Sequence, residues 1–110
     1  MNIQKDEKIK EVLREVVSEF LARESNRTSL ITVTNVELFS RGSRAKILIT
    51  VMPEDQEAAA IDFITRRLSD IREYVGEHVR MMRVPFLEVG IDIGEKNRQR
   101  IDEIEQEISN

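Results

Sequence analysis

Residues 30–51, LITVTNVELFSRGSRAKILITV, contain two runs of β-branched and aliphatic residues around a short polar loop. In each run apolar and polar side chains alternate, which is the pattern of a strand with one buried face. The loop at residues 40–44 contains a glycine and is short enough to reverse the chain. In the first run the apolar phase changes near Thr34 and Asn35, which predicts a β-bulge there. The segment therefore predicts an antiparallel hairpin, against which the rest of the chain can pack.

An amphipathic helix is predicted before the hairpin. Apolar residues recur there at steps of three and four, which places them on one side of a helix. They are Ile9, Val12, Leu13, Val16, Val17, Phe20 and Leu21. Asp6 suits the N-cap of this helix. The Ser25–Asn26 pair is expected to end it, because short polar side chains compete for backbone hydrogen bonds.

A long helical region is predicted after the hairpin, over residues 54–80. Pro53 ends the second strand, and apolar residues then continue at helical steps. Periodicity alone allows either one long helix or two helices joined by a kink. Val84–Pro85 ends the region, because a residue before proline is pushed towards extended geometry.

A third strand and a last helix complete the predicted fold. Residues 87–93 alternate apolar and polar side chains, which predicts a strand closed by Gly94. Three isoleucines mark one side of the final helix: Ile101, Ile104 and Ile108. The order of elements indicates a single α+β domain over residues 1–110. A three-stranded sheet with helices on one face is the simplest arrangement that buries the apolar stripes.

Composition excludes several classes of protein. No apolar run approaches the roughly 20 residues of a membrane span, and the first ten residues lack the continuous apolar core of an export signal. There is no cysteine, which removes disulfides and thiolate metal sites and is expected in a reducing compartment. We therefore expect a cytoplasmic protein with no membrane partner.

Charge is distributed unevenly along the chain. The net charge of −4 argues against a protein that coats nucleic acid indiscriminately. Residues 23–52 nevertheless have five basic side chains, one of which is Arg27, against two acidic ones. Residues 66–83 have five arginines against three acids. Residues 101–110 have four acids and no base. Positive charge is thus local.

The sequence contains no recognisable catalytic centre. His78 is the only histidine, so a histidine metal cluster is not possible, and at helical spacing we interpret it as a surface or boundary side chain. The carboxylates lie mostly within one helical turn of basic residues, as on a solvated face. The four glycines form no loop of the kind that cradles phosphates. We expect no enzymatic activity, no metal and no small-molecule cofactor.

One side of the predicted helical region combines small residues with arginines. This stripe consists of Thr65, Ser69, Arg72, Gly76, Arg80 and Arg83. Such a surface lets a phosphate backbone approach while guanidinium groups donate paired hydrogen bonds to it. Arg41, Arg44 and Lys46 of the hairpin are candidates to extend the surface. The alternatives are an ordinary charged helix face and basic residues that protect an exposed strand from association. With only five aromatic residues in the chain, base stacking is not expected to be the main mode of binding.

Several segments of the sequence resemble the bacterial ribosome-binding factor A family. LITVTNVEL (30–38) and SRAKILITV (43–51) are similar to the first hairpin of that family. IREYVG (71–76) and VRMMRVPFLEV (79–89) are similar to its isoleucine-arginine helix, basic turn and Val-Pro-x-Leu entry into the last strand. RIDEI (100–104) is similar to its closing helix. The resemblance covers nearly the whole chain in the same order.

The resemblance implies a type II KH-like αββααβ fold, with a three-stranded mixed sheet covered on one face by helices, plus a C-terminal helix. It implies a monomeric factor that binds the small (30S) ribosomal subunit and assists late maturation of its 16S rRNA, particularly near the 5′ end of that RNA. Carried over by position, the RNA-facing residues are Arg41, Arg44, Lys46, Ser69, Arg72, Gly76, Arg80 and Arg83. The family typically has an Ala-x-Gly kink between its two central helices, where this chain has Arg67-Leu68-Ser69. We expect a bend near Ser69, through hydrogen bonding of its hydroxyl to a carbonyl.

Two hypotheses of different classes follow. The first is a non-enzymatic RNA-binding assembly factor whose affinity comes mostly from phosphate contacts and shape. The second is a protein-interaction module of the same fold, which docks a protein partner through the acidic last helix and the hairpin edge.

Overall fold

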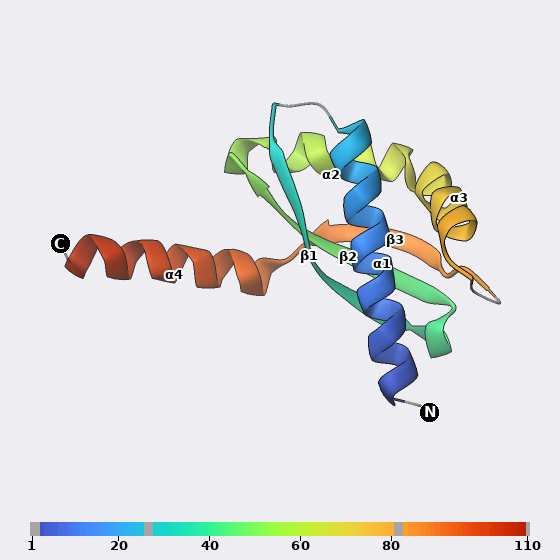
Figure 1. Cartoon of the computed structure of the whole chain (residues 1–110). Coiled ribbons are helices and arrows are strands. Elements are labelled where there is room, and N and C mark those ends of the chain that lie inside the picture. The colour runs from blue at the N-terminus through green and yellow to red at the C-terminus, as the bar shows by residue number, and fades with distance from the viewer. Residues whose placement is uncertain (1–2, 26–27, 81–82, 110) are drawn as a thin grey trace.

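Figure 1 shows the helices and strands in a computed structural model of the chain, which describes residues 3–25, 28–80 and 83–109. The elements are α1 (Ile3–Glu24), β1 (Leu30–Phe39), β2 (Arg44–Met52), α2 (Glu57–Arg66), α3 (Leu68–His78), β3 (Phe86–Ile91) and α4 (Ile93–Ser109). Single turns, η1 (Ser40–Gly42) and η2 (Glu54–Gln56), precede and follow β2. The predicted order is confirmed, with the helical region divided into α2 and α3. Asn26 and Arg27, and the methionine pair of the family motif, lie outside the described residues.

The hairpin forms two strands of a three-stranded mixed sheet in the order β1–β2–β3. β1 pairs antiparallel with β2, and the register shifts between Val33 and Asn35, which confirms the predicted bulge. β3 pairs parallel with β2. A parallel pair needs a long crossover connection, which the segment containing α2 and α3 supplies. β3 therefore lies at one edge of the sheet.

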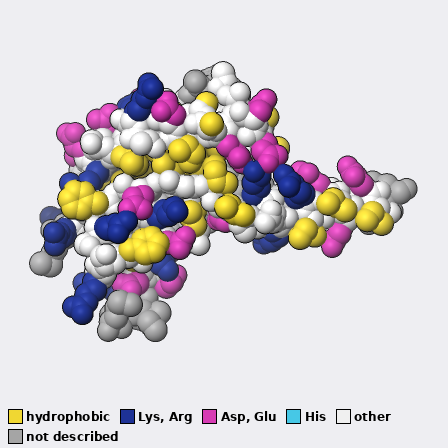
Figure 2. Space-filling model, turned by 180° about the vertical axis from the view of Figure 1, so that it is seen from behind, with side chains coloured by type: hydrophobic (Ala, Val, Ile, Leu, Met, Phe, Trp, Pro, Cys, Tyr) yellow, Lys and Arg dark blue, Asp and Glu magenta, His cyan; other side chains and the backbone are white. Residues whose placement is uncertain are grey.

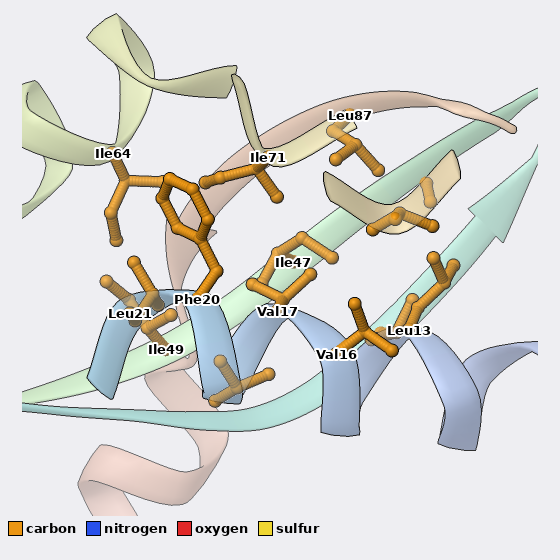
Figure 3. Packing of buried hydrophobic residues seen from close by; sticks show 14 of the residues in the cluster. Leu13, Val16, Val17, Phe20, Leu21, Ile47, Ile49, Ile64, Ile71 and Leu87 are labelled. Carbon is orange, nitrogen blue, oxygen red and sulfur yellow. The ribbon is translucent and has the colours of Figure 1, made fainter. Parts of the chain in front are cut away.

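Helices α1, α2 and α3 cover one face of the sheet (Figure 1). The other face is open and points towards the viewer in Figure 2, which shows the molecule from the opposite side. Alternate residues of β2 from Ala45 to Val51 are buried on the covered face. Figure 3 shows how the apolar side chains of the three helices meet those of β2. Labelled among them are Val17, Phe20, Ile47, Ile64 and Ile71. Each such side chain contributes about 1.5–3 kcal/mol when fully buried, so this single cluster is the main source of stability.

The break between α2 and α3 falls at Arg67, two residues before the bend expected at Ser69. The N–H of Arg67 donates to the Ile64 carbonyl at 2.9 Å, and its backbone leaves helical geometry at φ −105° and ψ 6°. Its guanidinium lies 5.1 Å from the Phe20 ring centroid and 3.6 Å from the Glu24 carboxylate. Contacts with α1 therefore hold the break in place, and a local serine effect is not what positions it.

Asp92 begins α4, so the third strand is shorter than predicted. Its Oδ1 accepts from the backbone N–H of Glu95 at 3.0 Å, which is an N-cap bond, and its Oδ2 accepts from the Thr34 hydroxyl at 2.6 Å. The prediction that the strand runs to Ile93 and closes at Gly94 is wrong, because both residues lie in the first turn of α4. The cap interrupts an alternation of side chains that would otherwise continue.

α4 extends away from the rest of the molecule (Figure 1). Its three predicted apolar residues are exposed, Ile101 by 55%, Ile104 by 49% and Ile108 by 79%. The expectation that every apolar stripe is buried against the sheet is therefore wrong for this helix. Among the described residues, no helix is both long enough and apolar enough to cross a membrane.

The base of α4 is held by charged side chains. Lys96 Nζ lies 2.5 Å from Glu54 Oε1 and 3.0 Å from Glu57 Oε2, and Arg100 Nη2 lies 3.2 Å from Glu54 Oε1. The hydrogen bond from Lys96 lowers the pKa of the Glu54 carboxyl, and the bond to Glu54 raises the pKa of Lys96. Ion pairs rather than apolar packing thus orient the helix.

Candidate nucleic-acid interface

A groove of about 600 Å³ lies between α3 and the segment that leads into β3. Its lining includes Ser69, Arg72, Glu73, Arg83, Val84 and Phe86. Three of the predicted RNA-binding residues, Ser69, Arg72 and Arg83, thus meet in one concave site. We call this site the α3–β3 groove.

Arg72 connects the two walls of the α3–β3 groove, which are α3 and the segment before β3. Its Nε donates to the Pro85 carbonyl at 3.2 Å and its Nη2 donates to the Val84 carbonyl at 3.0 Å. Its guanidinium carbon lies 4.4 Å from the centroid of the Phe86 ring. Arginine has five N–H donors, so these two bonds leave donors on the guanidinium for a ligand. Arg72, which is predicted to contact RNA, therefore also has a structural role, because it holds α3 to the start of β3.

The predicted stripe is not one continuous helical surface. α3 ends at His78, and Val79 is extended, so Arg80 and Arg83 lie beyond the helix. Both arginines are exposed, but only Arg83 lines the groove. Gly76 is exposed on α3, and a Cβ there would lie 3.7 Å from Val84, which is an ordinary contact. The loss of helical geometry after residue 78 places Arg80 apart from Ser69 and Arg72.

The basic residues of the hairpin lie on the open face of the sheet or in its turn. Arg44 forms an ion pair with Glu88 on β3, with its Nε 3.1 Å from the carboxylate. Lys46 crosses the neighbouring Gly90, where an added Cβ would lie 2.7 Å from its Cε. Arg41 is exposed in η1 with a positive φ of 57°. Figure 2 shows Lys and Arg on this face interspersed with acidic and apolar side chains.

Phe86 is the residue of this region that sequence reasoning missed. It is 58% exposed and lies opposite Arg44 in the sheet register, with Phe39 on the other side of Arg44. Leu87, the next residue, is buried. The signal was an aromatic side chain at a position that strand alternation assigns to the solvent side.

The acidic side chains at the other end of β3 are paired with basic ones. A second depression of about 540 Å³ lies between α2 and Ile91, and its lining includes Glu57 and Asp62. Lys96 lies 3.0 Å from Glu57 and Arg66 lies 3.2 Å from Asp62, so these carboxylates are compensated. The exposed Arg83 therefore marks the end of β3 that favours an anionic backbone.

In the part of the chain that the structure describes, no three His, Cys, Asp or Glu side chains lie close enough together to hold a metal ion. The His78 ring stacks on Tyr74 at 3.9 Å between centroids, and its Nδ1 lies 2.8 Å from the Tyr74 carbonyl oxygen. His78 is thus an exposed packing residue, as interpreted from its spacing.

The αββααβ order, the mixed sheet and the one-sided helices define an α+β protein with a type II KH-like fold, extended by a C-terminal helix. The family model for ribosome-binding factor A matches residues 5–105. The chain therefore belongs to the ribosome-binding factor A family.

Known members of the family are similar in sequence and in structure. Ribosome-binding factor A of Natranaerobius thermophilus is 28% identical over 88 residues, which cover 77% of this chain and 67% of that protein. The crystal structure of ribosome-binding factor A from Thermus thermophilus matches with a TM-score of 0.68 and 24% identity, over 76% of this chain and 92% of that one. A homology model of the Thermus factor, fitted into the cryo-electron-microscopy map of its 30S complex, matches with a TM-score of 0.63 and 25% identity, over 72% and 86% of the two chains.

Proposed function

We propose that the chain binds the small ribosomal subunit through its 16S rRNA and assists maturation of that RNA without catalysing a reaction. Membership of the ribosome-binding factor A family and the 30S complex of the Thermus relative support the subunit as partner. The observation that carries the proposal is the α3–β3 groove, which gathers Ser69, Arg72 and Arg83 on a protein of net charge −4. A local cationic groove on an acidic protein favours one site on RNA over indiscriminate coating. We further propose that the chain acts in the cytoplasm as a single-domain monomer.

Three of the predicted arginines are free to contact phosphates: Arg41, Arg80 and Arg83. All three are exposed, and none has an ion-pair partner among the described residues. Arg44 and Arg72 have a different role. Glu88 holds the guanidinium of Arg44, and two backbone carbonyls hold that of Arg72. They shape the surface that the RNA meets, while the free arginines provide the salt-dependent attraction.

Co-sedimentation with purified small subunits across a salt series tests the proposal. The double variant Arg80→Glu/Arg83→Glu is expected to weaken binding and to reduce the dependence of the association constant on salt, by about 0.7 in log–log slope for each lost contact to single-stranded RNA. Lys8→Glu/Arg14→Glu is the matched control, because both residues are exposed on α1 and the charge change is the same. Equal loss in both variants would reduce the effect to overall charge and remove the case for specific contacts at Arg83 in the groove and at Arg80 beyond α3.

A second candidate function, docking of a protein partner, is favoured by α4. Its exposed isoleucines lie beside the acidic residues Asp102, Glu103 and Glu107, which fits a basic and partly apolar protein surface. The variant Ile101→Ser/Ile104→Ser separates the two candidates. Subunit binding that is lost in this variant but retained after reversal of Arg80 and Arg83 would favour the protein partner.

A further inference from the structure

Phe86 exposes an aromatic ring at the rim of the α3–β3 groove. It is the first residue of β3, it lines the groove, and more than half of its surface, 58%, is accessible. A single exposed phenylalanine is ordinary on a protein surface and carries no conclusion alone. The contacts around this ring are what set it apart.

One face of the Phe86 ring is covered by a fixed cation. The Arg72 guanidinium lies over the ring at 4.4 Å, and its bonds to the carbonyls of Val84 and Pro85 prevent it from swinging away. Pro85 is fully buried, so the backbone just before the ring is anchored. The ring is therefore held in place before any ligand arrives, and an incoming group loses little entropy of the protein side chain on binding.

Donors for a phosphate backbone lie next to the same ring. Ser69 and Arg83 line the groove with Phe86. Proteins that bind single-stranded nucleic acid combine these two features, a cationic path for the backbone and an aromatic face on which a base stacks. Unpaired ribosomal nucleotides offer both partners, since their bases can leave the helical stack.

We propose that Phe86 is a stacking platform for one unpaired nucleobase, which lies on the ring on the side away from Arg72 while the adjoining phosphate contacts Arg83. The inference rests on the proposed function and assigns to its site a contact with a base rather than with the backbone. Shape and phosphate contacts still supply most of the affinity, because this platform receives one base.

Binding of two labelled RNA probes to the full chain tests the platform. One probe is a short oligoadenylate, and the other is an abasic oligoribonucleotide of equal length with the same phosphates and no bases. Fluorescence anisotropy is expected to show tighter binding of the oligoadenylate. Phe86→Ala is expected to weaken oligoadenylate binding by about 5- to 150-fold, the range for loss of one base stack, and to leave abasic binding and the salt dependence unchanged.

Two further variants keep the result interpretable. Phe86→Trp keeps a stacking face, so it should retain affinity, and its emission should be quenched by the oligoadenylate and not by the abasic probe. Phe39→Ala is the matched control, because Phe39 is exposed on the same open face beside Arg44 but does not line the groove. Its binding is expected to equal that of the parent chain.

Three results would overturn the inference. Equal oligoadenylate binding by Phe86→Ala and the parent, with both still sedimenting with small subunits, removes the platform and leaves the proposed function standing. Loss of subunit binding in Phe86→Ala without any change in RNA affinity assigns Phe86 to a protein contact. Failure of the parent chain to bind either probe or the subunits removes the proposed function itself.

Discussion

Replacing Arg72 by alanine tests whether this residue holds α3 to β3. The change deletes two hydrogen bonds to backbone carbonyls and the contact with the Phe86 ring. Bonds from a charged donor contribute about 1.5–3 kcal/mol each when shielded, but Arg72 is only half-buried, so we take about 0.75–1 kcal/mol for each bond. The cation–π contact adds about 0.5–1 kcal/mol. We therefore expect the free energy of unfolding to fall by about 2–3 kcal/mol.

Urea and thermal unfolding followed by circular dichroism measure this loss, which should lower Tm by about 10–20 °C for a domain of this size. Arg72→Lys keeps the charge but cannot present two N–H groups in a planar fork, so an intermediate loss is expected. Arg66→Ala is the control, because its pair with Asp62 is a surface ion pair with both side chains mostly exposed and should cost at most about 0.5 kcal/mol. A loss in Arg72→Ala no larger than in Arg66→Ala would refute the structural role of Arg72.

Three other predictions concern the core, the cap of α4 and the charged base of that helix. Ile71→Ala empties a position that is 1% exposed and should cost about 2–5 kcal/mol in urea unfolding, whereas Ile104→Ala on the exposed face of α4 should change stability by less than about 0.5 kcal/mol. Asp92→Ala removes the N-cap bond and should cost about 0.5–2 kcal/mol; no loss would mean that the cap does not start α4. Because the pKa of Glu54 is lowered, the stability that its carboxylate adds to the attachment of α4 is present above the usual carboxyl value of 4.5 and is lost as the pH falls below it. Because the pKa of Lys96 is raised, the stability that its ammonium group adds is kept up to at least pH 10.5. The protection factors of the α4 amides, which compare each observed exchange rate with the intrinsic rate at the same pH, should therefore fall in acid, and Glu54→Gln should lower them at neutral pH; protection factors that are independent of pH would contradict this attachment.

The packing around Arg67 shows how a sequence departure can be absorbed. The family's glycine-containing kink is replaced here by Arg67-Leu68-Ser69, yet the chain still divides into α2 and α3. The Arg67 guanidinium compensates through Phe20 and Glu24 of α1 and through Asp70, whose carboxylate lies 2.9 Å from its Nε. A break enforced by side-chain contacts does not need a residue with special backbone freedom.

The α1 stripe, the hairpin with its bulge and the order of the elements were determined by the sequence alone. Each depends on a repeat of 3.6 or two residues, so neighbours along the chain specify it. The tendency of basic residues to cluster within residues 66–83 was also visible. The family resemblance agreed with these local patterns from the first helix to the last.

Only the tertiary structure decided what the individual side chains do. Arg72 bonds to carbonyls 12 and 13 residues away, and Asp92 joins α4 to Thr34, 58 residues away. Arg80 does not line the groove, because helical geometry ends at His78, and the isoleucines of α4 are exposed, because this helix extends away from the sheet (Figure 1). Periodicity reports which side of an element is apolar, but the partner that meets that side depends on how distant segments pack. The physical reason is that hydrogen bonds and ion pairs act over a few ångströms in space, whatever the separation of the residues in sequence.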